Sequence, residues 1–587
     1  MSLNKILIAN RGEVAVRVAR ACADAGIGSV AVYSEEDRDA FHVRAADEAF
    51  SLGGSGASAT YLNPDALLAA AQRSAADAVH PGYGFLAESA EFARAVTDAG
   101  LVWIGPSPEA IEALGDKTSA RRIAARAGAP LIEGTADPVA DVAEVEAFAA
   151  AHGFPLLIKA AFGGGGRGQR VVRSAEEIGE AFAAASREAV AAFGRGECFV
   201  ERYLDRPRHI EAQCLADAFG AVAVLSTRDC SVQRRHQKLV EEAPAPFLAP
   251  EVEAEIDRAS RAILKEVGYV GAATCEFLLD SAGTLAFLEV NTRLQVEHPV
   301  TEEVTGIDLV REQFRIADGQ PLGYTEAPAR GCAIEFRING EDPAAGFLPS
   351  PGLITALRLP SGPGVRCDFG YEAGDSVSGA FDSLIGKVVV SGADRAQALA
   401  RARRALRDLE VAGPRTVAPV HQAILAAGEF CADRDRDQSF SVHTCWLETE
   451  WQGLGDAADP AVDAAEAPAV ERLAIEVSGK RFEVVLPAGL GRPAQSPMAQ
   501  HRTRRTSRRA QIPAQAEGTV TAPMQGTIVQ VPVCDGQTVE AGQVLVVLEA
   551  MKMEQPLTAL RPGVVTDLAA RVGDRVAAGA VLCALAD

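Results

Sequence analysis

Residues 274–303 read TCEFLLDSAGTLAFLEVNTRLQVEHPVTEE, and this stretch predicts two strands joined by a tight turn. The turn falls at residues 280–283, DSAG, between two apolar runs. On the second strand a polar residue occupies every other position, so an extended chain would place all of them on one face above an apolar face. The polar positions are Glu289, Asn291, Arg293, Gln295 and Glu297. The alternate positions are Leu288, Val290, Thr292, Leu294 and Val296.

Pairing of the two strands brings one more carboxylate to the polar face. A loop of two or four residues places Glu276 opposite or diagonal to Glu289, about 5–8 Å away. Two carboxylates and an amide at this separation suit a hard cation such as Mg²⁺. A half-exposed strand with one wet face shows the same alternation, so the pattern alone leaves both interpretations open.

Length and composition exclude several classes of protein. The 587 residues predict three or four domains. A net charge of −22 disfavours nucleic-acid and anionic-membrane partners, since both require a basic surface. The 11 cysteines form no C-x-x-C pair, which favours a reducing compartment. The apolar run at 6–9 is too short for a signal peptide and no segment could span a bilayer, so we expect a cytoplasmic protein.

The first hundred residues predict a parallel sheet. A strand at 5–10, a helix at 13–25 and a strand at 29–34 form a strand–helix–strand unit. The turn at 10–13 lacks the G-x-G-x-x-G spacing, so a dinucleotide site is not supported. The loop PGYGF follows a strand that ends at His80, where open sheets bind ligands. A tight Gly-Pro turn is the alternative interpretation of this loop.

A glycine-rich loop lies between two predicted strands. The strand at 156–160 contains Lys159, and the second strand covers 169–172. Between them, five glycines fill six positions at 163–168, which lets backbone N–H groups approach an anion. The loop is not a Walker A motif, because G-K-[ST] is absent and a strand follows it. We interpret it as a flap over phosphates, with a flexible hairpin tip as the alternative.

The C-terminal third changes in composition and then repeats itself. Residues 456–468 and 491–518 read as linker and tether, and they flank a hairpin predicted at 473–486. Beyond the tether, glycines and apolar residues recur at a constant offset (563 − 526 = 37), which predicts two intertwined halves in an all-β sandwich. The midpoint, EAMKME at 549–554, places Lys552 at a hairpin tip between two methionines. An ordinary surface lysine is the alternative.

Two resemblances to known families follow from these motifs. The C-terminal segment resembles the biotinyl domain, whose AMKM motif carries the biotin-accepting lysine, which implies biotin on Lys552. Lipoyl domains share this fold, but their lysine usually lies in a DKA-like context, which favours biotin. Residues 1–447 resemble biotin carboxylase, an ATP-grasp enzyme. The motifs are IANRGE, HPGYGFLAE, GGGGRG, RHIE, RRHQKLVEEAP and FLEVNTRLQVEHPVTE.

The resemblance implies an α/β and α+β architecture. Its parts are a Rossmann-like N-terminal domain, an ATP-grasp domain with a lid at about 131–203, a C-terminal domain, a linker with a small hairpin, and a small all-β biotinyl (lipoyl-like) domain. The expected boundaries are 1–115, 116–330, 331–447, 448–518 and 519–587.

The resemblance also implies a role for each site residue. ATP binding is implied for Lys117, Lys159, Gly163, Gly164, Gly165, Gly166, Glu201, His209 and His236. Magnesium or manganese would be held by Glu276, Glu289 and Asn291. Bicarbonate would contact Lys238, Arg293, Gln295 and Val296, with Glu297 as general base and Arg337 facing the biotin ureido oxygen. Phe336 departs from the family, since many members have a smaller residue there, and this bears on the shape of the local pocket.

The combination of these domains without a carboxyltransferase resembles the α subunit of actinobacterial acetyl-/propionyl-CoA carboxylases. It implies ATP-dependent carboxylation of the carrier's biotin by bicarbonate through carboxyphosphate, and transfer by a separate β subunit that makes precursors of fatty acids or polyketides. The hairpin at 473–486 is our candidate for docking that subunit. Further implied partners are a biotin protein ligase, other copies of the chain and a small accessory subunit.

Three other functions remain open from the sequence. The chain could be the α subunit of a methylcrotonyl-CoA or other acyl-CoA carboxylase. It could be another ATP-grasp ligase with a lipoyl-like carrier, which predicts no avidin signal. It could also be a non-catalytic carrier scaffold, which requires a lost site residue, whereas Lys238, Arg293, Glu297 and Arg337 are all present.

Overall fold

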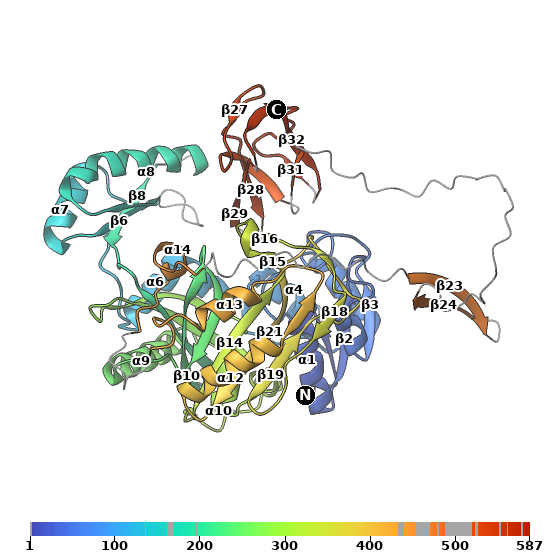
Figure 1. The fold of residues 1–587 in the computed structure, drawn as a ribbon. Coiled ribbons are helices and arrows are strands. Elements are labelled where there is room, and N and C mark those ends of the chain that lie inside the picture. Colours follow the sequence, from blue (N-terminus) through green and yellow to red (C-terminus); the bar gives the residue numbers. More distant parts are fainter. Residues whose placement is uncertain are drawn as a thin grey trace. The chain divides into compact units, whose positions relative to one another are not determined.

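The computed structural model divides the chain into two compact units, residues 1–458 and 459–587 (Figure 1). The residues expected to form the linker at 456–468 and the tether at 491–518 lie outside the described residues, as do the glycines at 163–166 and Lys552. The structure describes residues 3–135, 137–160, 169–193, 196–432, 440–453, 470–477, 480–487, 519–522, 526–550, 553–559, 561–576 and 579–586.

A five-stranded parallel sheet begins the first unit, as the strand–helix–strand pattern predicted. Helix α1 (Gly12–Ala25) ends at Gly26, which adopts φ 69°. The first strand stops short of Asn10, because the Asn10 side chain turns to donate to the backbone carbonyls of Pro81 and Tyr83. The strands across the sheet are β3 (Glu48–Ser51), β2 (Gly28–Tyr33), β1 (Lys5–Ile8), β4 (Ala78–His80) and β5 (Val102–Trp103).

Short helices cover this sheet and lead out of it. The last of them is capped by Ser107, whose hydroxyl accepts from the Ala110 N–H, with Pro108 in the first turn. The helices are α2 (Phe41–Ala45), α3 (Pro64–Ser74), α4 (Ala90–Asp98) and α5 (Pro108–Gly115).

A small three-stranded sheet follows, with its own hydrophobic core. The two strands predicted on either side of the glycine-rich loop are both present with the predicted bounds. The strands in order are β7 (Gln169–Val172), β6 (Leu156–Ala160) and β8 (Cys198–Arg202), and the helices on this sheet are α7 (Val142–His152) and α8 (Ile178–Phe193).

An eight-stranded antiparallel sheet forms the centre of the first unit. Because β11 pairs with β14, this one sheet joins strands from residues 208–291 to strands from residues 332–392. The order is β13 (Leu285–Asn291), β12 (Gly271–Leu279), β9 (Arg208–Ala216), β10 (Val222–Arg234), β11 (Gln237–Ala243), β14 (Cys332–Asn339), β21 (Leu384–Gly392) and β19 (Val365–Phe369).

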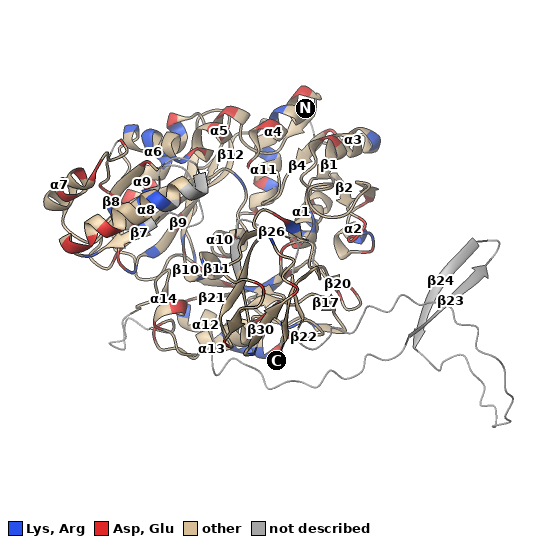
Figure 2. Cartoon of the chain, turned by 90° about the horizontal axis from the view of Figure 1, so that it is seen from above, with Lys and Arg blue, Asp and Glu red and all other residues tan. Residues whose placement is uncertain are grey.

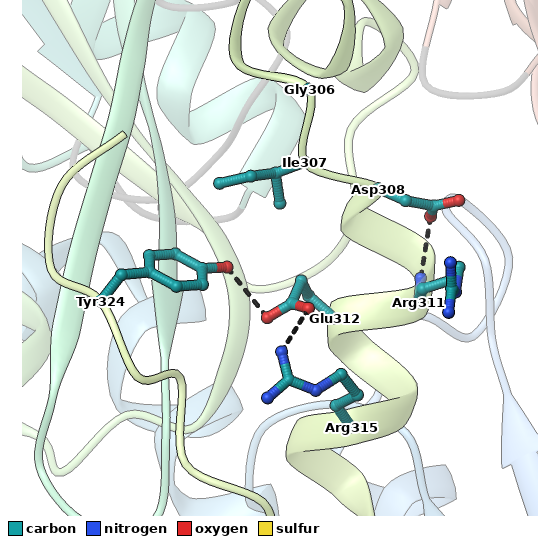
Figure 3. A pocket seen from close by; sticks show the side chains of 7 residues that line it. All are labelled: Gly306, Ile307, Asp308, Arg311, Glu312, Arg315 and Tyr324. Carbon is teal, nitrogen blue, oxygen red and sulfur yellow. Dashed lines mark hydrogen bonds and ion pairs between the residues drawn. The ribbon is translucent and has the colours of Figure 1, made fainter. Parts of the chain in front are cut away.

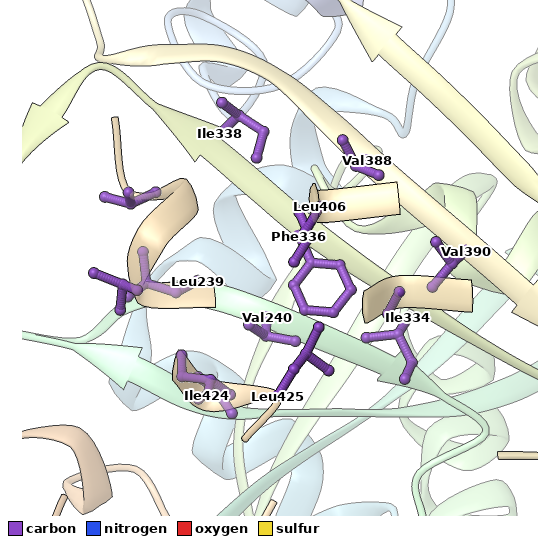
Figure 4. Packing of buried hydrophobic residues seen from close by; sticks show 14 of the residues in the cluster. Leu239, Val240, Ile334, Phe336, Ile338, Val388, Val390, Leu406, Ile424 and Leu425 are labelled. Carbon is purple, nitrogen blue, oxygen red and sulfur yellow. The ribbon is translucent and has the colours of Figure 1, made fainter. Parts of the chain in front are cut away.

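The two faces of this sheet differ in polarity. Phe336 and Arg337 are neighbours on β14 and therefore point to opposite faces. Phe336 is fully buried among Val240, Val388 and other apolar side chains (Figure 4), and its ring centroid lies 5.4 Å from that of His421. The departure from the family at Phe336 therefore lies in the hydrophobic core, on the opposite face of the sheet from Arg337.

The remaining helices of the first unit pack around these sheets. Helix α6 (Lys117–Arg126) carries four basic residues and no acidic one, whereas the carboxylates of α7 make that helix acidic (Figure 2). No helix among the described residues is long and apolar enough to cross a membrane. The others are α9 (Pro250–Glu266), α10 (His298–Thr305), α11 (Leu309–Ala317), α12 (Arg395–Asp408), α13 (Ala418–Ile424) and α14 (Trp446–Thr449).

Three two-stranded pairs complete the first unit. They are β15 (Glu341–Asp342) with β16 (Leu348–Pro349), β17 (Gly352–Leu353) with β20 (Ser376–Val377), and β18 (Ala356–Arg358) with β22 (Glu410–Ala412).

The second unit contains the predicted hairpin and the predicted sandwich. The hairpin pairs β23 (Val470–Val477) with β24 (Lys480–Pro487). The sandwich has two four-stranded sheets, and each sheet contains strands from both halves of the repeat. One is β25 (Thr519–Thr521), β32 (Val581–Ala586), β30 (Gly563–Thr566) and β27 (Thr538–Val539). The other is β29 (Met553–Thr558), β28 (Val544–Ala550), β26 (Gly526–Gln530) and β31 (Arg575–Val576).

The offset of the repeat recurs in the hydrogen bonds of the sandwich. Gly536 N donates to Val565 O at 2.7 Å, and Gly573 N donates to Ile528 O at 2.7 Å. Both glycines have positive φ, 83° and 94°, where a residue with a Cβ is strained. At the midpoint Ala550 pairs with Met553, so residues 551–552 connect the two halves. The intertwined sandwich predicted from the spacing is confirmed.

Candidate functional site

The β12–β13 hairpin places the first two carboxylates side by side. Glu276 and Glu289 are direct register partners, as the predicted turn required. Asp280 closes that turn, because its Oδ1 accepts from Ala282 N at 2.9 Å and from Thr284 N at 2.7 Å. Sequence reasoning therefore located this pair correctly.

The five-residue polar row does not lie on one strand. Strand β13 ends at Asn291, and Glu297 instead precedes helix α10 as its N-cap. Pro299 fits the first turn of that helix, so the chain must leave the extended conformation before it. A bulge between Glu276 and Phe277 also leaves Leu288 exposed, contrary to the apolar face that we expected.

The polar side chains nevertheless meet, through hydrogen bonds rather than through strand periodicity. Glu276 Oε1 accepts from Asn291 Nδ2 at 2.7 Å and from Gln295 Nε2 at 3.1 Å. Arg293 donates to Gln295 Oε1 at 2.8 Å and to Asn291 Oδ1 at 3.1 Å. Its Nε lies 3.1 Å from the carboxylate of Glu88, which follows the PGYGF loop. The site therefore joins that loop to the hairpin.

Lys238 occupies the centre of the site. Its Nζ lies 2.7 Å from Glu211 Oε2, 3.1 Å from Glu276 Oε1 and 2.7 Å from Glu297 Oε1. Burial alone would lower the pKa of Lys238, but the three carboxylates outweigh burial and raise it well above its usual value. Lys238 is therefore a fixed ammonium that balances charges from β9, β12 and the start of α10.

Glu211 and Arg228 were missed by sequence reasoning, although the RHIE motif contains Glu211. Arg228 is fully buried and donates to Glu211 Oε1 at 2.6 Å. Burial would raise the pKa of Glu211, but Lys238 and Arg228 lower it to about 2. The available signal was its period-two spacing from His209, which places both side chains on one face of β9.

Glu297 is held between two cations. Its Oε1 faces Lys238, and its Oε2 accepts from Arg337 Nη2 at 2.9 Å. Burial would raise the pKa of Glu297, but Lys238 and Arg337 together lower it. Arg337 also donates to Glu241 at 2.5 Å, and burial raises the pKa of that carboxyl to about 7. Glu241 is a third residue that sequence reasoning missed, because its contact depends on the pairing of β11 with β14.

The residues expected to bind nucleotide fall into separate groups. His209 Nε2 contacts Glu276 Oε2 at 2.8 Å, and its Nδ1 accepts from Gln233 Nε2 at 2.8 Å. On the small sheet, Lys159 donates to Glu201. Lys117, the first residue of α6, interacts electrostatically with Glu289.

The other expected residues are His236, Val296 and the glycines at 163–166. His236 is exposed at the β10–β11 turn with φ 62°, and no hydrogen bond or ion pair of its side chain is found within the described ranges. Val296 enters the site through its backbone, because its carbonyl accepts from Lys387 Nζ at 2.7 Å. The glycines at 163–166 lie outside the described residues, so their relation to the cluster remains an expectation.

The donors around Glu289 suit a divalent cation. Burial and the neighbouring Glu276 raise the pKa of Glu289, and within the described residues no hydrogen bond to its carboxylate is found. Two adjacent carboxylates with an amide oxygen form an all-oxygen donor set, which hard cations prefer. His209, Glu211 and Glu276 also have donor atoms within 4.8 Å of one another, but Lys238 already neutralises that group.

A pocket beside α11 was not expected from the sequence. It has a volume of about 340 Å³ and is lined by residues of α11 and its approach, with Tyr324 on the opposite wall (Figure 3). The Glu312 carboxylate already accepts hydrogen bonds from Arg315 Nη1 at 2.7 Å and from the Tyr324 hydroxyl at 2.9 Å. The second carboxylate of the pocket, that of Asp308, also has a partner, since it lies 2.7 Å from Arg17 Nη2, and we assign the pocket no role.

Comparison with known families matches four segments of the chain and leaves residues 450–517 unmatched. Residues 2–111 match "Biotin carboxylase, N-terminal domain", and residues 335–449 match "Biotin carboxylase C-terminal domain". Residues 116–325 match "Carbamoyl-phosphate synthase L chain, ATP binding domain". Residues 518–585 match "Biotin-requiring enzyme".

Individual relatives agree with these matches. The biotin-dependent acyl-coenzyme A carboxylase alpha3 subunit of Mycobacterium leprae is 54% identical over 98% of both chains. The biotin carboxylase of a Nostoc species is 48% identical over 73% of this chain and 97% of its own.

Solved structures show the same likeness. A Campylobacter jejuni biotin carboxylase has a TM-score of 0.69 and 40% identity over 75% of this chain and 98% of its own. The biotin carboxylase domain of Hydrogenobacter thermophilus 2-oxoglutarate carboxylase, solved with MgADP and bicarbonate, has a TM-score of 0.69 and 42% identity over 78% and 100%.

The charge balance around Lys238 predicts how Glu211→Gln affects stability. Near neutral pH we expect the variant to lose about 3 kcal/mol of unfolding free energy, because two buried cations lose a counter-charge. The pKa of Glu211 falls from 4.5 to about 2 on folding, so its contribution is full above 4.5 and is lost as pH falls toward 2. The difference between variant and wild type should therefore shrink at acid pH. Urea unfolding at about pH 7 and about pH 3.5 measures it.

Glu255→Gln is the matched control, since Glu255 forms a half-exposed pair with Arg258. We expect this change to alter stability by about 0.5 kcal/mol or less. Equal stability of Glu211→Gln and wild type near neutral pH would contradict the account.

Proposed function

The chain belongs to the biotin carboxylases that carry their own biotinyl domain, the alpha subunits of biotin-dependent acyl-CoA carboxylases, and from this premise we propose how its site works. Bicarbonate is activated by ATP in the first unit, and the carboxyl group passes to the biotin of its own carrier domain. A separate carboxyltransferase subunit then carboxylates acetyl-CoA or propionyl-CoA in the cytoplasm. The observation that carries this proposal is the carboxylate of Glu297 held between Lys238 and Arg337.

Glu276, Glu289 and Asn291 would hold the magnesium ion that accompanies ATP. A divalent ion there would neutralise the negative charge on the phosphate oxygens of ATP. Lys117 and Lys159 add positive charge on the nucleotide side. Glu201, His209, His236 and the glycines at 163–166 complete the proposed nucleotide contacts. A related domain solved with MgADP and bicarbonate supports this use of the site.

Bicarbonate would bind where Lys238, Arg293, Gln295 and the backbone of Val296 come together. Arg293 offers a planar guanidinium that can bond two oxygens of a planar anion, which a lysine cannot do. Gln295 already orients this guanidinium through its Oε1 at 2.8 Å. The substrate oxygen would then lie between Arg293 and the Lys238 ammonium.

Glu297 is the proposed general base. It takes the proton of bicarbonate while a bicarbonate oxygen attacks the γ-phosphorus of ATP, which gives ADP and carboxyphosphate. A bound anionic substrate would also attract the Lys238 ammonium and so weaken the ion pair between Lys238 and Glu297. The carboxylate thereby becomes more basic when the proton must be taken.

Arg337 is proposed to act in the second step. Carboxyphosphate breaks into CO₂ and phosphate, and the phosphate can take the ureido proton. When bound, the biotin of Lys552 supplies the ureido nitrogen that accepts the carboxyl group. Arg337 offers its guanidinium to the ureido oxygen, where negative charge develops. Because Glu297 already orients Arg337 at 2.9 Å, the two steps share one set of residues.

Glu297→Gln tests the proposed base. We expect bicarbonate-dependent ATP cleavage to fall by about 10²–10⁴-fold, since the proton acceptor is lost. Glu303→Gln is the control on the same helix, and its rate should stay within about twofold of wild type. Lys552→Arg should abolish the avidin signal and keep carboxylation of free biotin.

The measurement is release of ADP with and without bicarbonate, together with an avidin blot. A wild-type rate in Glu297→Gln would contradict the assignment of the base. An avidin signal that persists in Lys552→Arg would contradict the assignment of the biotinylated lysine.

The β23–β24 hairpin is our proposed docking element for the carboxyltransferase. Residues 448–518 are too few to bind and carboxylate an acyl-CoA, and we propose that a separate carboxyltransferase subunit carries out the transfer. A hairpin of two strands is only marginally stable alone, which suits an element that gains stability on a partner. Other copies of this chain, a biotin protein ligase and a small accessory subunit are proposed as further partners.

Replacement of residues 470–487 by a Gly/Ser segment of equal length tests this docking. We expect the carboxyltransferase to be lost from a pull-down, whereas bicarbonate-dependent ATP cleavage stays unchanged because the first unit is intact. Undiminished binding of the carboxyltransferase by the replaced chain would eliminate the hairpin as the docking element.

A further inference from the structure

Lys387 is a buried cation that the proposed function leaves unused. It lies on β21 with a fully buried side chain. Its Nζ donates to the Val296 backbone carbonyl at 2.7 Å and lies 3.5 Å from Glu13 Oε1. One ammonium therefore joins the C-terminal strands, the first turn of α1 and the turn that carries Glu297.

The register of the sheet explains why Lys387 points toward the site. It pairs directly with Arg337 on β14 and with Asp368 on β19. Its chain neighbour Val388 faces the hydrophobic core with Phe336 (Figure 4). Because side chains alternate along a strand, Lys387 shares the polar face with Arg337. The two cations are therefore cross-strand neighbours on the polar face of the sheet.

A lysine at this position is costly to the fold. Burial would lower the pKa of Lys387, but Glu13, Glu335 and Asp368 outweigh burial and raise it. Buried ion pairs can often be replaced by apolar side chains without loss of stability. A purely structural role could therefore be filled by apolar side chains, whereas a bond to the Val296 carbonyl requires a side-chain donor, which Lys387 supplies.

The bond to Val296 acts where strand geometry no longer holds the chain. Strand β13 has ended at Asn291, and helix α10 has not yet begun. In this turn, His298 Nδ1 lies 2.8 Å from the Gln295 carbonyl oxygen. Lys387 donates a hydrogen bond to the carbonyl of the next residue, Val296. These two bonds orient the side chains of Gln295 and Glu297 on either side of Val296.

We propose that Lys387 is a positioning residue for bicarbonate activation, holding the Gln295–Glu297 turn so that Glu297 reaches both Lys238 and Arg337. Glu13, whose Oε1 lies 3.5 Å from the ammonium, balances part of its charge, and the bond to the Val296 carbonyl does the positioning. The inference rests on the bicarbonate role proposed for this turn. Within the described residues, Lys387 makes no hydrogen bond or ion pair with a proposed nucleotide contact, so its loss should affect the bicarbonate side of the reaction.

Lys387→Met removes the donor while keeping a side chain of similar length. We expect kcat/KM for bicarbonate to fall by about 10²-fold, because small displacements of a reacting group have effects of this size. The KM for ATP should stay within about twofold of wild type. Lys265→Met, on the exposed face of α9, is the control for loss of a lysine and should change neither parameter.

The double variant Glu13→Gln with Lys387→Met separates positioning from stability. Loss of the ammonium alone leaves buried carboxylates without a cation, so the single variant should have a lower Tm. The double variant removes one of those carboxylates and should recover Tm, but it lacks the donor to Val296 and should keep the low kcat/KM for bicarbonate. It also provides the kinetic measurement where the single variant does not fold.

Glu13→Gln alone keeps the Lys387 donor, so its kcat/KM for bicarbonate should stay within about threefold of wild type. The proposal is overturned if the double variant recovers activity together with Tm. It is also overturned if Lys387→Met keeps the wild-type kcat/KM for bicarbonate. Absence of bicarbonate-dependent ATP cleavage in the unmodified chain would instead refute the proposed function on which the inference rests.

Discussion

The ammonium of Lys238, shared by three carboxylates, is the interaction on which the rest of the site depends. Glu211, Glu276 and Glu297 come from β9, β12 and the start of α10, and each lies within 3.1 Å of its Nζ. Without a cation at their centre, these buried carboxylates would repel one another or take up protons. With Lys238 in place they stay ionised, and the same ammonium remains available to an anionic substrate. The Lys238 ammonium therefore serves both the stability of the fold and the proposed reaction.

The eight-stranded sheet explains how so many charges can be buried together. Alternation along β11, β14 and β21 sends Val240, Phe336 and Val388 into one hydrophobic core and sends Glu241, Arg337 and Lys387 to the opposite face. The apolar face supplies the burial that stabilises the sheet. The polar face then holds its side chains in fixed register. The pairing of β11 with β14 is decisive, because it places Arg337 beside Glu241. From that position Arg337 also donates to Glu297.

Local pattern predicted the features that depend on near neighbours. The 280–283 turn fixes the register that pairs Glu276 with Glu289, and the 37-residue offset recurs in the strands of the sandwich. Strand periodicity failed beyond Asn291, because the helix that starts before Pro299 interrupts it. Glu241 and Lys387 escaped notice because their partners are distant in sequence, and no local spacing records which strands will pair. The face that Phe336 occupies was not predicted from the sequence either, since it depends on the packing of α12 and α13.

The central claim is that the charged side chains around Lys238 promote the phosphorylation of bicarbonate by ATP, which gives carboxyphosphate. The most direct measurement is the fate of ¹⁸O from labelled bicarbonate during ATP cleavage by the purified chain with free biotin. If a bicarbonate oxygen attacks the γ-phosphorus, one labelled oxygen must appear in each inorganic phosphate that is released. Phosphate without label, released at the bicarbonate-dependent rate, would mean that water attacks ATP instead, and the account of this site would be wrong.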